Sequence, residues 1–265
     1  MAELSARARS MQESAIRKLD LTVSQQRGVR FHRLNIGQPD IATPAPLLEA
    51  AAAFQPSVLT YGPASGTPEA RLAAAGWLAR LDPTIGPQDV VLTTGGSEAL
   101  LFAFAVVGDP GDDVLVLEPY YTNYNGFATV VGMGVRPVAT SLATGFALPT
   151  DEELDAAVGP RTRAVVFSNP GNPTGAVYGR EDLQRLLAWA ERRDLFVIAD
   201  EVYRRIWFDA PPTSALEFPE HQGRVIVVDS LSKTWSACGL RLGLLASRSA
   251  EVMERVERLG QARLG

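Results

Sequence analysis

Short apolar runs alternate with longer helical segments over most of this sequence. The runs that we expect to form strands are residues 90–93, 114–117, 164–167, 195–199 and 225–228. The segments that we expect to form helices are residues 67–81, 97–107 and 180–193. Nearly continuous apolar strands must be covered on both faces. The alternation therefore predicts an α/β domain with a mostly parallel sheet sandwiched by helices.

Residues 1–40 do not follow this alternation. We expect them to form an arginine-rich amphipathic helix, followed by a turn-rich segment at residues 34–40. Glycine, proline, asparagine and aspartate clustered in this way favour turns over regular secondary structure. We therefore expect these residues to form an N-terminal arm outside the sheet.

The composition limits the classes of partner. Of the 265 residues, 46% are hydrophobic, and the net charge is −5 with acidic and basic residues interspersed. This balance provides no basic surface for nucleic acid or for an anionic membrane, so we expect small molecules as partners. The single cysteine, Cys238, excludes an internal disulfide. Two histidines are too few for a structural zinc cluster, so we expect no metal site.

Neither export nor membrane insertion is indicated by the sequence. The first residues lack the apolar core of a secretory signal. No apolar run approaches the roughly 20 residues that span a bilayer. We therefore expect a cytoplasmic protein.

Lysine is rare in this chain. It occurs only at positions 18 and 233, although lysines and arginines together number 25. Lys233 follows the expected strand of residues 225–228, within the sequence Ser-Leu-Ser-Lys-Thr. Arginine can supply positive charge, but only a lysine amine can deprotonate and condense with an aldehyde. Lys233 is therefore a candidate for Schiff-base chemistry, and a basic loop residue is the alternative interpretation.

Other polar and aromatic residues follow the expected strands, where open parallel sheets bind ligands. Gly96 and Ser97 begin a helix whose N–H groups can bind an anion, or they are ordinary helix-capping residues. Tyr121 can lie against a planar ring or pack in the core. Asn172 lies among two Asn-Pro pairs and is a candidate donor to a ligand. Asp200 ends an apolar strand and needs a cationic partner, unless it caps the next helix.

Four motifs, taken in order, carry a resemblance to a known family. They are Asn-Pro-Gly-Asn-Pro-Thr-Gly at residues 169–175, Asp-Glu-Val-Tyr at 200–203, Ser-Leu-Ser-Lys-Thr at 230–234 and Gly-Leu-Arg-Leu-Gly at 239–243. Together they resemble the pyridoxal-phosphate-dependent aminotransferases of the aspartate aminotransferase (class I) family, and order and spacing agree over residues 31–246. The resemblance implies the fold type I architecture and pyridoxal 5′-phosphate (PLP) as cofactor.

The resemblance also implies catalytic and ring-binding roles. Lys233 would hold the cofactor as an internal aldimine and then move a proton between the substrate Cα and the cofactor. Asp200 would pair with the pyridine nitrogen and keep it protonated. Tyr203 and Asn172 would donate hydrogen bonds to the phenolate oxygen, and Tyr121 would stack on the ring.

Phosphate-binding and intersubunit roles follow from the same resemblance. The groups that would hold the phosphate are the backbone amides of Gly96 and Ser97, the Ser230 hydroxyl and the Arg241 guanidinium. Tyr61 matches the family's tyrosine that reaches the neighbouring subunit's phosphate, which implies a homodimer with shared active sites. Gly37 lies in the family's N-terminal loop that closes over the substrate.

The resemblance further sets an expected domain organisation. Residues 1–40 would form the arm and part of a small domain, residues 41–248 the large PLP-binding domain, and residues 249–265 the start of a helix that leads to a C-terminal small domain. Family members carry the arginine for the substrate α-carboxylate in that small domain, whereas this sequence stops at Gly265. We therefore expect a complete cofactor pocket, an incomplete substrate pocket and poor turnover.

The function implied is amino transfer between an L-amino acid and a 2-oxo acid by a ping-pong mechanism. Aspartate with 2-oxoglutarate is the expected pair. One alternative is a PLP-dependent β-lyase or decarboxylase, because the protein decides which Cα bond breaks and the cofactor motifs do not separate these reactions. The other alternative is a truncated paralogue that binds PLP without catalysis. The products of the half-reaction discriminate among the three.

Overall fold

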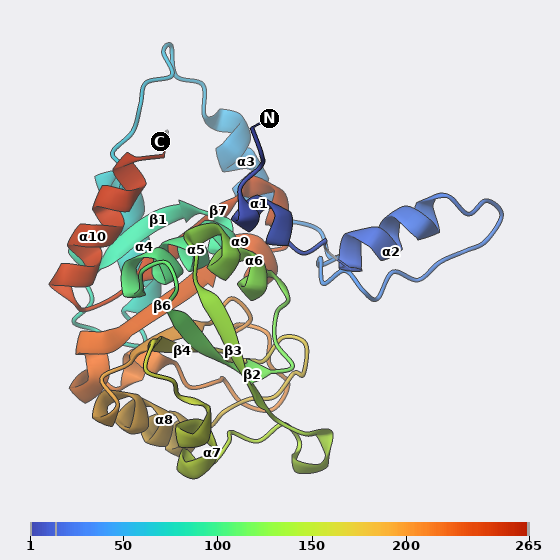
Figure 1. The fold of residues 1–265 in the computed structure, drawn as a ribbon. Helices are drawn as coiled ribbons and strands as arrows, with labels where there is room; N and C mark the ends of the chain where they lie inside the picture. Colours follow the sequence, from blue (N-terminus) through green and yellow to red (C-terminus); the bar gives the residue numbers. More distant parts are fainter. Residues whose placement is uncertain (1, 14, 264–265) are drawn as a thin grey trace.

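A seven-stranded sheet forms the centre of the computed structural model, which describes residues 2–13 and 15–263 (Figure 1). The strands are β1 (Val90–Thr94), β2 (Asp113–Glu118), β3 (Gly134–Ala139), β4 (Thr162–Ser168), β5 (Phe196–Asp200), β6 (Val225–Ser230) and β7 (Leu242–Ala246). Their order across the sheet is β1-β7-β6-β5-β4-β2-β3. β7 runs antiparallel to both of its neighbours, and the remaining adjacent pairs are parallel. The predicted mostly parallel sheet is confirmed.

Helices cover both faces of this sheet. The α-helices are α1 (Ala6–Ser10), α2 (Ala15–Ser24), α3 (Ala45–Ala53), α4 (Pro68–Leu78), α5 (Gly95–Val107), α6 (Asn123–Val131), α7 (Asp151–Ala157), α8 (Arg180–Arg192), α9 (Leu231–Thr234) and α10 (Ala250–Gln261). Short 3-10 helices occur at Pro87–Asp89, Leu142–Thr144, Ala215–Glu217, Pro219–Arg224 and Cys238–Leu240. Helices α4, α7 and α8 pack on one face, and α5, α6 and α10 pack on the other. The predicted helix-sheet-helix layering is therefore confirmed.

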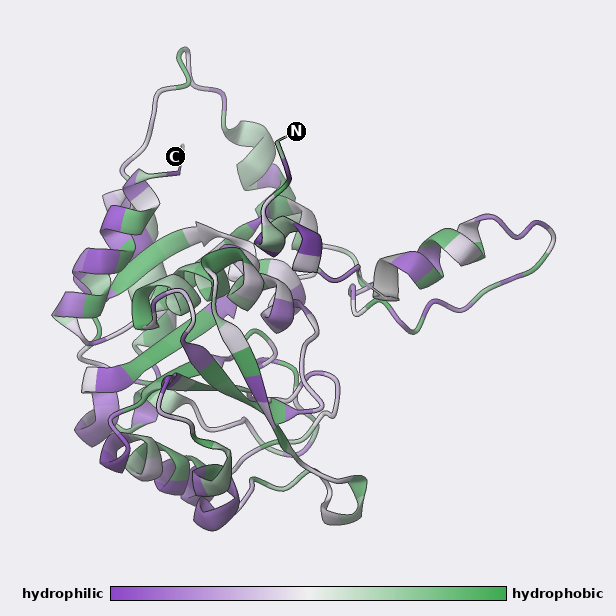
Figure 2. Cartoon of the chain, viewed as in Figure 1, coloured by the Kyte–Doolittle hydropathy of each residue, from purple (hydrophilic) through white to green (hydrophobic). Residues whose placement is uncertain are grey.

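Side-chain alternation along the central strands divides the core into two halves. In β6, Val225 and Val227 pack in the cluster that contains α4 and α8, whereas Ile226 and Val228 pack in the cluster that contains α5 and α10. All four side chains are fully buried, and each such burial stabilises the fold by about 1.5–3 kcal/mol. Figure 2 shows the strands as largely hydrophobic, with hydrophilic residues along α8 and α10. Burial on both faces is why these strands lack polar alternation in the sequence.

Two strands have no counterpart in the sequence prediction. β3 lies at the edge of the sheet and contains Pro137, which has no N–H for a ladder hydrogen bond. β7 lies between β1 and β6 as an antiparallel insertion, and it begins within the last two residues of the motif at residues 239–243. The expected helices also shift at their ends, since α4 ends at Leu78 and α5 already begins at Gly95.

The N-terminal segment contains no strand within residues 2–13 and 15–40. Near α1, Asn125 of α6 donates a hydrogen bond of 3.3 Å to Gln12. Figure 1 shows α2 projecting away from the sheet. The proposed domain boundaries stay predictions, and residues 1, 14 and 264–265 lie outside the described part of the chain. In the described part, no helix is long and apolar enough to cross a membrane.

Candidate active site

A cavity of about 440 Å³ opens where the central parallel strands end. Every residue to which the resemblance assigns a role lines this cavity, with the exception of Tyr61. The lining residues among them are Gly37, Gly96, Ser97, Tyr121, Asn172, Asp200, Tyr203, Ser230, Lys233 and Arg241. Most of them follow the carboxyl ends of β1, β2, β4, β5 and β6, which lie at one edge because these strands run in the same direction.

Asp200 ends β5 and is buried, with 4% of its surface exposed. Its Oδ1 accepts a hydrogen bond of 3.3 Å from the backbone N–H of Val202, and its Oδ2 accepts one of 2.8 Å from the Tyr124 hydroxyl. Burial raises the pKa of this carboxyl to about 6, and the hydrogen bond from Tyr124 opposes that rise. A cation in the cavity would therefore gain a strong ionic partner.

Tyr124 is a site residue that the sequence prediction missed. It is 1% exposed, in the first turn of α6, and burial together with the negative charge of Asp200 raises the pKa of its hydroxyl well above the usual range. The hydroxyl therefore stays protonated and acts as a donor. The sequence does contain a feature that points to Tyr124: three tyrosines occur within residues 120–124, directly after an expected strand.

Lys233 extends from α9 into the cavity. Its Nζ donates a hydrogen bond of 2.8 Å to the backbone carbonyl of Gly37 and lies 5.9 Å from the centre of the Tyr203 ring. Ser230 caps the N-terminus of this short helix, and its hydroxyl accepts a hydrogen bond of 3.1 Å from the Ser232 amide. The N-terminal arm thus covers the only lysine at the site, and the amine is held within reach of the other cavity residues.

The N-terminus of α5 forms one end of the cavity. Thr94 precedes the helix, and its side chain makes no capping hydrogen bond with it. Arg241 approaches from the segment before β7, donating hydrogen bonds to the carbonyls of Cys238 (2.9 Å) and Thr94 (3.4 Å). Gly95 has a φ of +74°, and a Cβ at this position would lie 2.6 Å from Nη2 of Arg241. Glycine therefore permits the close approach of a guanidinium to helix amides, which together suit an anion.

Tyrosine rings form the wall beside Asp200. The ring of Tyr121 meets that of Tyr124 edge to face, with centroids 5.5 Å apart, and the Tyr121 hydroxyl accepts a hydrogen bond of 2.7 Å from Asn123. Burial raises the pKa of Tyr203 to about 12, so its hydroxyl is a donor at neutral pH. Asn172 reaches the same cavity from the segment between β4 and α8.

Tyr61 lies outside the cavity and is 83% exposed. It belongs to the segment between α3 and α4, which Figure 1 shows as an extended projection. The base of the segment is anchored, since Arg263 donates hydrogen bonds to the carbonyls of Ala64 (2.9 Å) and Leu92 (2.8 Å). Within one chain, the structure does not bring Tyr61 to the other site residues.

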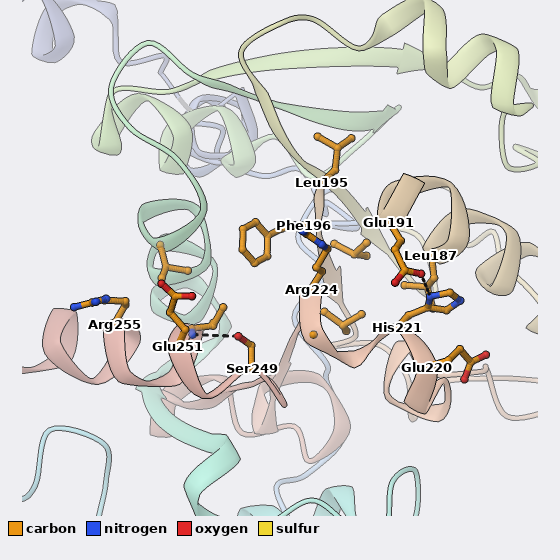
Figure 3. A pocket seen from close by; sticks show the side chains of 15 residues that line it. Leu187, Glu191, Leu195, Phe196, Glu220, His221, Arg224, Ser249, Glu251 and Arg255 are labelled. Atoms are coloured by element: carbon orange, nitrogen blue, oxygen red, sulfur yellow. Dashed lines mark hydrogen bonds and ion pairs between the residues drawn. The ribbon is translucent and has the colours of Figure 1, made fainter. Parts of the chain in front are cut away.

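A second cavity, of about 590 Å³, lies at the opposite ends of the strands, where β5 and β6 begin. Figure 3 shows Glu191 and His221 pointing toward one another across its wall, and the atoms that join them are 2.8 Å apart. Arg224, also in this wall, forms an ion pair with Asp194. Glu220 and Arg255 in the same wall also have partners, Gln184 and Glu254, and the cavity contains no lysine. The candidate catalytic and cofactor-binding residues line the cavity of about 440 Å³ and not this second one.

The amino-acid sequence of this chain matches a known protein family over most of its length. A family model described as "Aminotransferase class I and II" matches residues 30–263. The chain belongs to this aminotransferase family. The resemblance based on the four motifs is confirmed, and the family's cofactor is PLP.

Two curated aminotransferases show how similar this chain is to other family members and how much of their length it spans. The aspartate/prephenate aminotransferase of Thermus thermophilus is 34% identical over 248 residues, which are 92% of this chain and 63% of the relative. The aspartate aminotransferase of Thermotoga maritima is 35% identical over 224 residues, or 84% of this chain and 59% of the relative. The chain thus spans about 60% of the length of these relatives.

Solved structures agree with the predicted fold type. The aspartate aminotransferase of Thermus thermophilus with maleate matches with a TM-score of 0.90 at 32% identity, over 99% of this chain and 69% of that one. The aspartate aminotransferase of Thermotoga maritima matches with a TM-score of 0.92 at 33% identity, over 98% of this chain and 70% of that one. The chain therefore has the fold of these aminotransferases.

Proposed function

We propose that this chain binds PLP in the cavity at the carboxyl ends of the strands and transfers amino groups between an L-amino acid and a 2-oxo acid. The observation that carries the proposal is the convergence of Lys233, Asp200 and Arg241 on one cavity. They offer an amine, a buried carboxylate and a guanidinium beside a helix N-terminus. These are the partners that an aldehyde, a pyridine nitrogen and a phosphate require.

The residues present fit the cofactor at both of its ends. At the ring end, burial raises the pKa of the Asp200 carboxyl. A protonated pyridine nitrogen would give this carboxylate an ionic partner. At the phosphate end, the Gly95 conformation leaves room for Arg241 beside the first amides of α5. We assign Gly96, Ser97 and Ser230 to the phosphate, and Tyr121, Asn172 and Tyr203 to the ring.

The chemistry divides between cofactor and protein. When bound, PLP draws electrons away from the bonds at the substrate Cα. Lys233 would accept the Cα proton and deliver it to a cofactor carbon two bonds away, because its amine can act as a base once it is no longer bonded to the cofactor. Asp200 holds a proton at the pyridine nitrogen, and Tyr124 keeps that carboxylate ionised and oriented. Tyr203 donates a hydrogen bond at the ring oxygen.

The proposed substrates are an L-amino acid and a 2-oxo acid, with aspartate and 2-oxoglutarate as the first pair to test. The names of the relatives support this choice, since several are aspartate aminotransferases and one structure of such an enzyme was solved with maleate, a dicarboxylate. Gly37, whose carbonyl accepts a hydrogen bond from Lys233, lies in the segment that we propose to close over the substrate.

We also propose that two copies of this chain form a dimer with shared active sites, and that they work in the cytoplasm. Apolar side chains in the segment that carries Tyr61 support an interface, because Phe54, Val58 and Leu59 are 68–80% exposed. Exposed apolar groups gathered in one segment favour association. In this arrangement, Tyr61 of one copy would reach the phosphate site of the other.

Borohydride trapping tests the cofactor assignment. Reduction of the protein in the presence of PLP should leave a stable C–N bond to Lys233, located by mass spectrometry of the labelled peptide. The chain contains a matched control, because Lys18 is its only other lysine. Label on Lys18 alone, or on neither lysine, would contradict the proposal.

Product analysis then tests the reaction. Incubation of the PLP-loaded protein with aspartate should yield oxaloacetate and the amine form of the cofactor. Release of carbon dioxide from aspartate would instead indicate a decarboxylase, and release of ammonia, pyruvate and sulfide from cysteine, which carries a leaving group on Cβ, would indicate a β-lyase. Binding of PLP without any product would favour a non-catalytic protein.

A further inference from the structure

Three buried charged residues form a linked group behind the proposed cofactor site. Glu201 is 1% exposed, Asp229 is 3% exposed, and Arg204, which lies between their carboxylates, is 4% exposed. Nε of Arg204 lies 3.2 Å from Oε2 of Glu201, and its Nη2 donates a hydrogen bond of 3.0 Å to Oδ2 of Asp229. The two contacts use different nitrogens of one rigid guanidinium, so Arg204 spans both carboxylates at once.

This group lies where the pairing of β5 with β6 ends. The last residues paired in that ladder are Asp200 and Val228. Beyond them, one further backbone hydrogen bond of 2.9 Å runs from Glu201 N–H to the Val228 carbonyl. Past that point the ion pairs of Arg204 connect the two chain segments. The ion pairs of Arg204 with Glu201 and Asp229, which we call the bridge, therefore hold the ends of β5 and β6 together up to the positions where the site residues begin.

The bridge and the cavity occupy opposite faces of the sheet. Ala199 and Val227 pack on the face that carries α4, and Glu201 and Asp229 follow them by the two-residue repeat of a strand. Asp200 and its neighbours in the cavity belong to the other face. Arg204 accordingly does not line the cavity, although the residues adjacent to its two partners, Asp200 and Ser230, do.

Further donors hold the two carboxylates in place. Glu201 accepts hydrogen bonds from the Ser214 hydroxyl (2.7 Å) and the Ala215 amide (2.8 Å). Oδ2 of Asp229 accepts a hydrogen bond of 3.0 Å from Nε1 of Trp77 in α4. Oδ1 of Asp229 accepts one of 2.7 Å from the Ser230 amide, which is the backbone of a proposed phosphate ligand. These hydrogen bonds favour one arrangement of the two carboxylates, while Nε of Arg204 itself makes only the ionic contact with Glu201.

We propose that Arg204 is a positioning residue for the cofactor: by bridging Glu201 and Asp229 on one face of the sheet, it holds Asp200 and Ser230 at their spacing on the other. Asp200 serves the ring end of PLP and Ser230 serves the phosphate end, so their spacing sets the fit of both ends at once. The inference rests on the proposed function. Without Arg204, two buried carboxylates lose their shared cation, and the ends of β5 and β6 separate or rearrange.

The test compares Arg204→Met with Arg163→Met. Arg163 pairs with Asp112, another carboxylate that is 4% exposed, at the opposite end of the strands, and Asp112 keeps a second partner in Arg161. Arg204→Met takes one arginine from two buried carboxylates and Arg163→Met takes one arginine from a single buried carboxylate, and in both variants each carboxylate retains another donor. Both are expected to lower the unfolding temperature of the cofactor-free protein. Only Arg204→Met is expected to weaken PLP binding, by about tenfold in Kd.

Two more variants make the outcome decisive. Arg204→Lys should recover part of the lost affinity, since an ammonium can reach one of the two carboxylates. Trp77→Phe removes one donor to Asp229 without leaving a charge unpaired, and it should weaken PLP binding by about threefold even if Arg204→Met does not fold. Kd is measured by absorbance titration well below the unfolding temperature of every variant.

The results separate this inference from the proposed function. Equal PLP affinity in the parent chain, Arg204→Met and Trp77→Phe would overturn the positioning role and leave the proposed function standing. Equal weakening by Arg204→Met and Arg163→Met would also overturn it, since the effect would then be general destabilisation. A parent chain that fails to bind PLP would overturn the proposed function and this inference with it.

Discussion

The hydroxyl of Tyr124 and the carboxylate of Asp200 are joined by a 2.8 Å hydrogen bond between two buried side chains that lie 76 positions apart in the sequence. The bond connects the first turn of α6 to the end of β5. Because it favours the ionised carboxylate, it opposes the effect of burial on the pKa of Asp200. The balance between these two effects sets the pKa of Asp200, and therefore how readily its carboxylate can pair with a protonated ring nitrogen.

Tyr124→Phe should therefore slow the half-reaction with an amino acid by about tenfold, because a hydrogen bond to a charged group contributes about 1.5–3 kcal/mol. The measurement is a single-turnover rate in the PLP-loaded protein. Tyr178→Phe is the matched control, since Tyr178 is also buried but lies outside the cavity. Equal rates in the Tyr124 variant and the parent chain would contradict the role of this hydroxyl.

A change in pH should alter the stability of the cofactor-free chain through Asp200. Burial raises the pKa of this carboxyl from 3.8 to about 6, so the folded state holds the proton more tightly than the unfolded state. The stabilisation by that proton is fully present below the unfolded pKa and is lost as the pH rises through the folded pKa. It amounts to up to about 3 kcal/mol, because each pKa unit corresponds to about 1.4 kcal/mol.

Asp200→Asn removes this titration while keeping the shape of the side chain. The free energy of unfolding of the variant should match that of the parent near pH 4 and exceed it by about 2–3 kcal/mol above pH 6.5. Urea unfolding at a series of pH values measures the difference. Burial also raises the pKa of Glu201 to about 7, but that group titrates in both proteins and cancels in the comparison. A difference that is constant with pH would contradict the raised pKa of Asp200.

Gly95→Ala should weaken the binding of PLP by about tenfold, since the added Cβ would lie 2.6 Å from Arg241 and displace its guanidinium from the α5 N-terminus. Gly145→Ala is the control: Gly145 has a similar positive φ of +65°, but a Cβ there meets nothing within 4 Å. Both variants carry the backbone strain of about 1 kcal/mol. Pyridoxal, which lacks the phosphate, should bind Gly95→Ala and the parent chain equally. A parallel loss for pyridoxal would show that the effect is not at the phosphate.

Mixing two inactive variants tests the sharing of active sites. Lys233→Arg lacks the reactive amine, and Tyr61→Ala lacks the tyrosine proposed to reach the partner. In a mixed dimer, Lys233 of the second variant meets Tyr61 of the first and rebuilds one complete site. The mixture should then recover up to about half of the parent activity per mixed dimer. Activity equal to the sum of the separate variants would contradict shared sites.

The positions of the cofactor-binding motifs follow from local sequence. Lys233, Asp200 and Asn172 each follow an apolar run that forms a buried strand, and parallel strands bring such positions to one sheet edge whatever the details of packing. The five strands and three helices expected within residues 67–228 likewise depend on local hydrophobic periodicity. These features could be predicted because one short segment contains all the information that determines each of them.

The remaining features depend on contacts between segments distant in sequence. β7 forms a strand because β1 and β6 pair with it on both sides, and four hydrophobic residues and a glycine near a turn do not indicate this on their own. Tyr124 becomes a partner of Asp200, and Arg204 a partner of Asp229, only when separate elements pack together. The sequence by itself determined the fold class and the family motifs, because local patterns encode them. Only the tertiary structure decided which buried charges and hydroxyls meet, because burial and distance are properties of the packed chain.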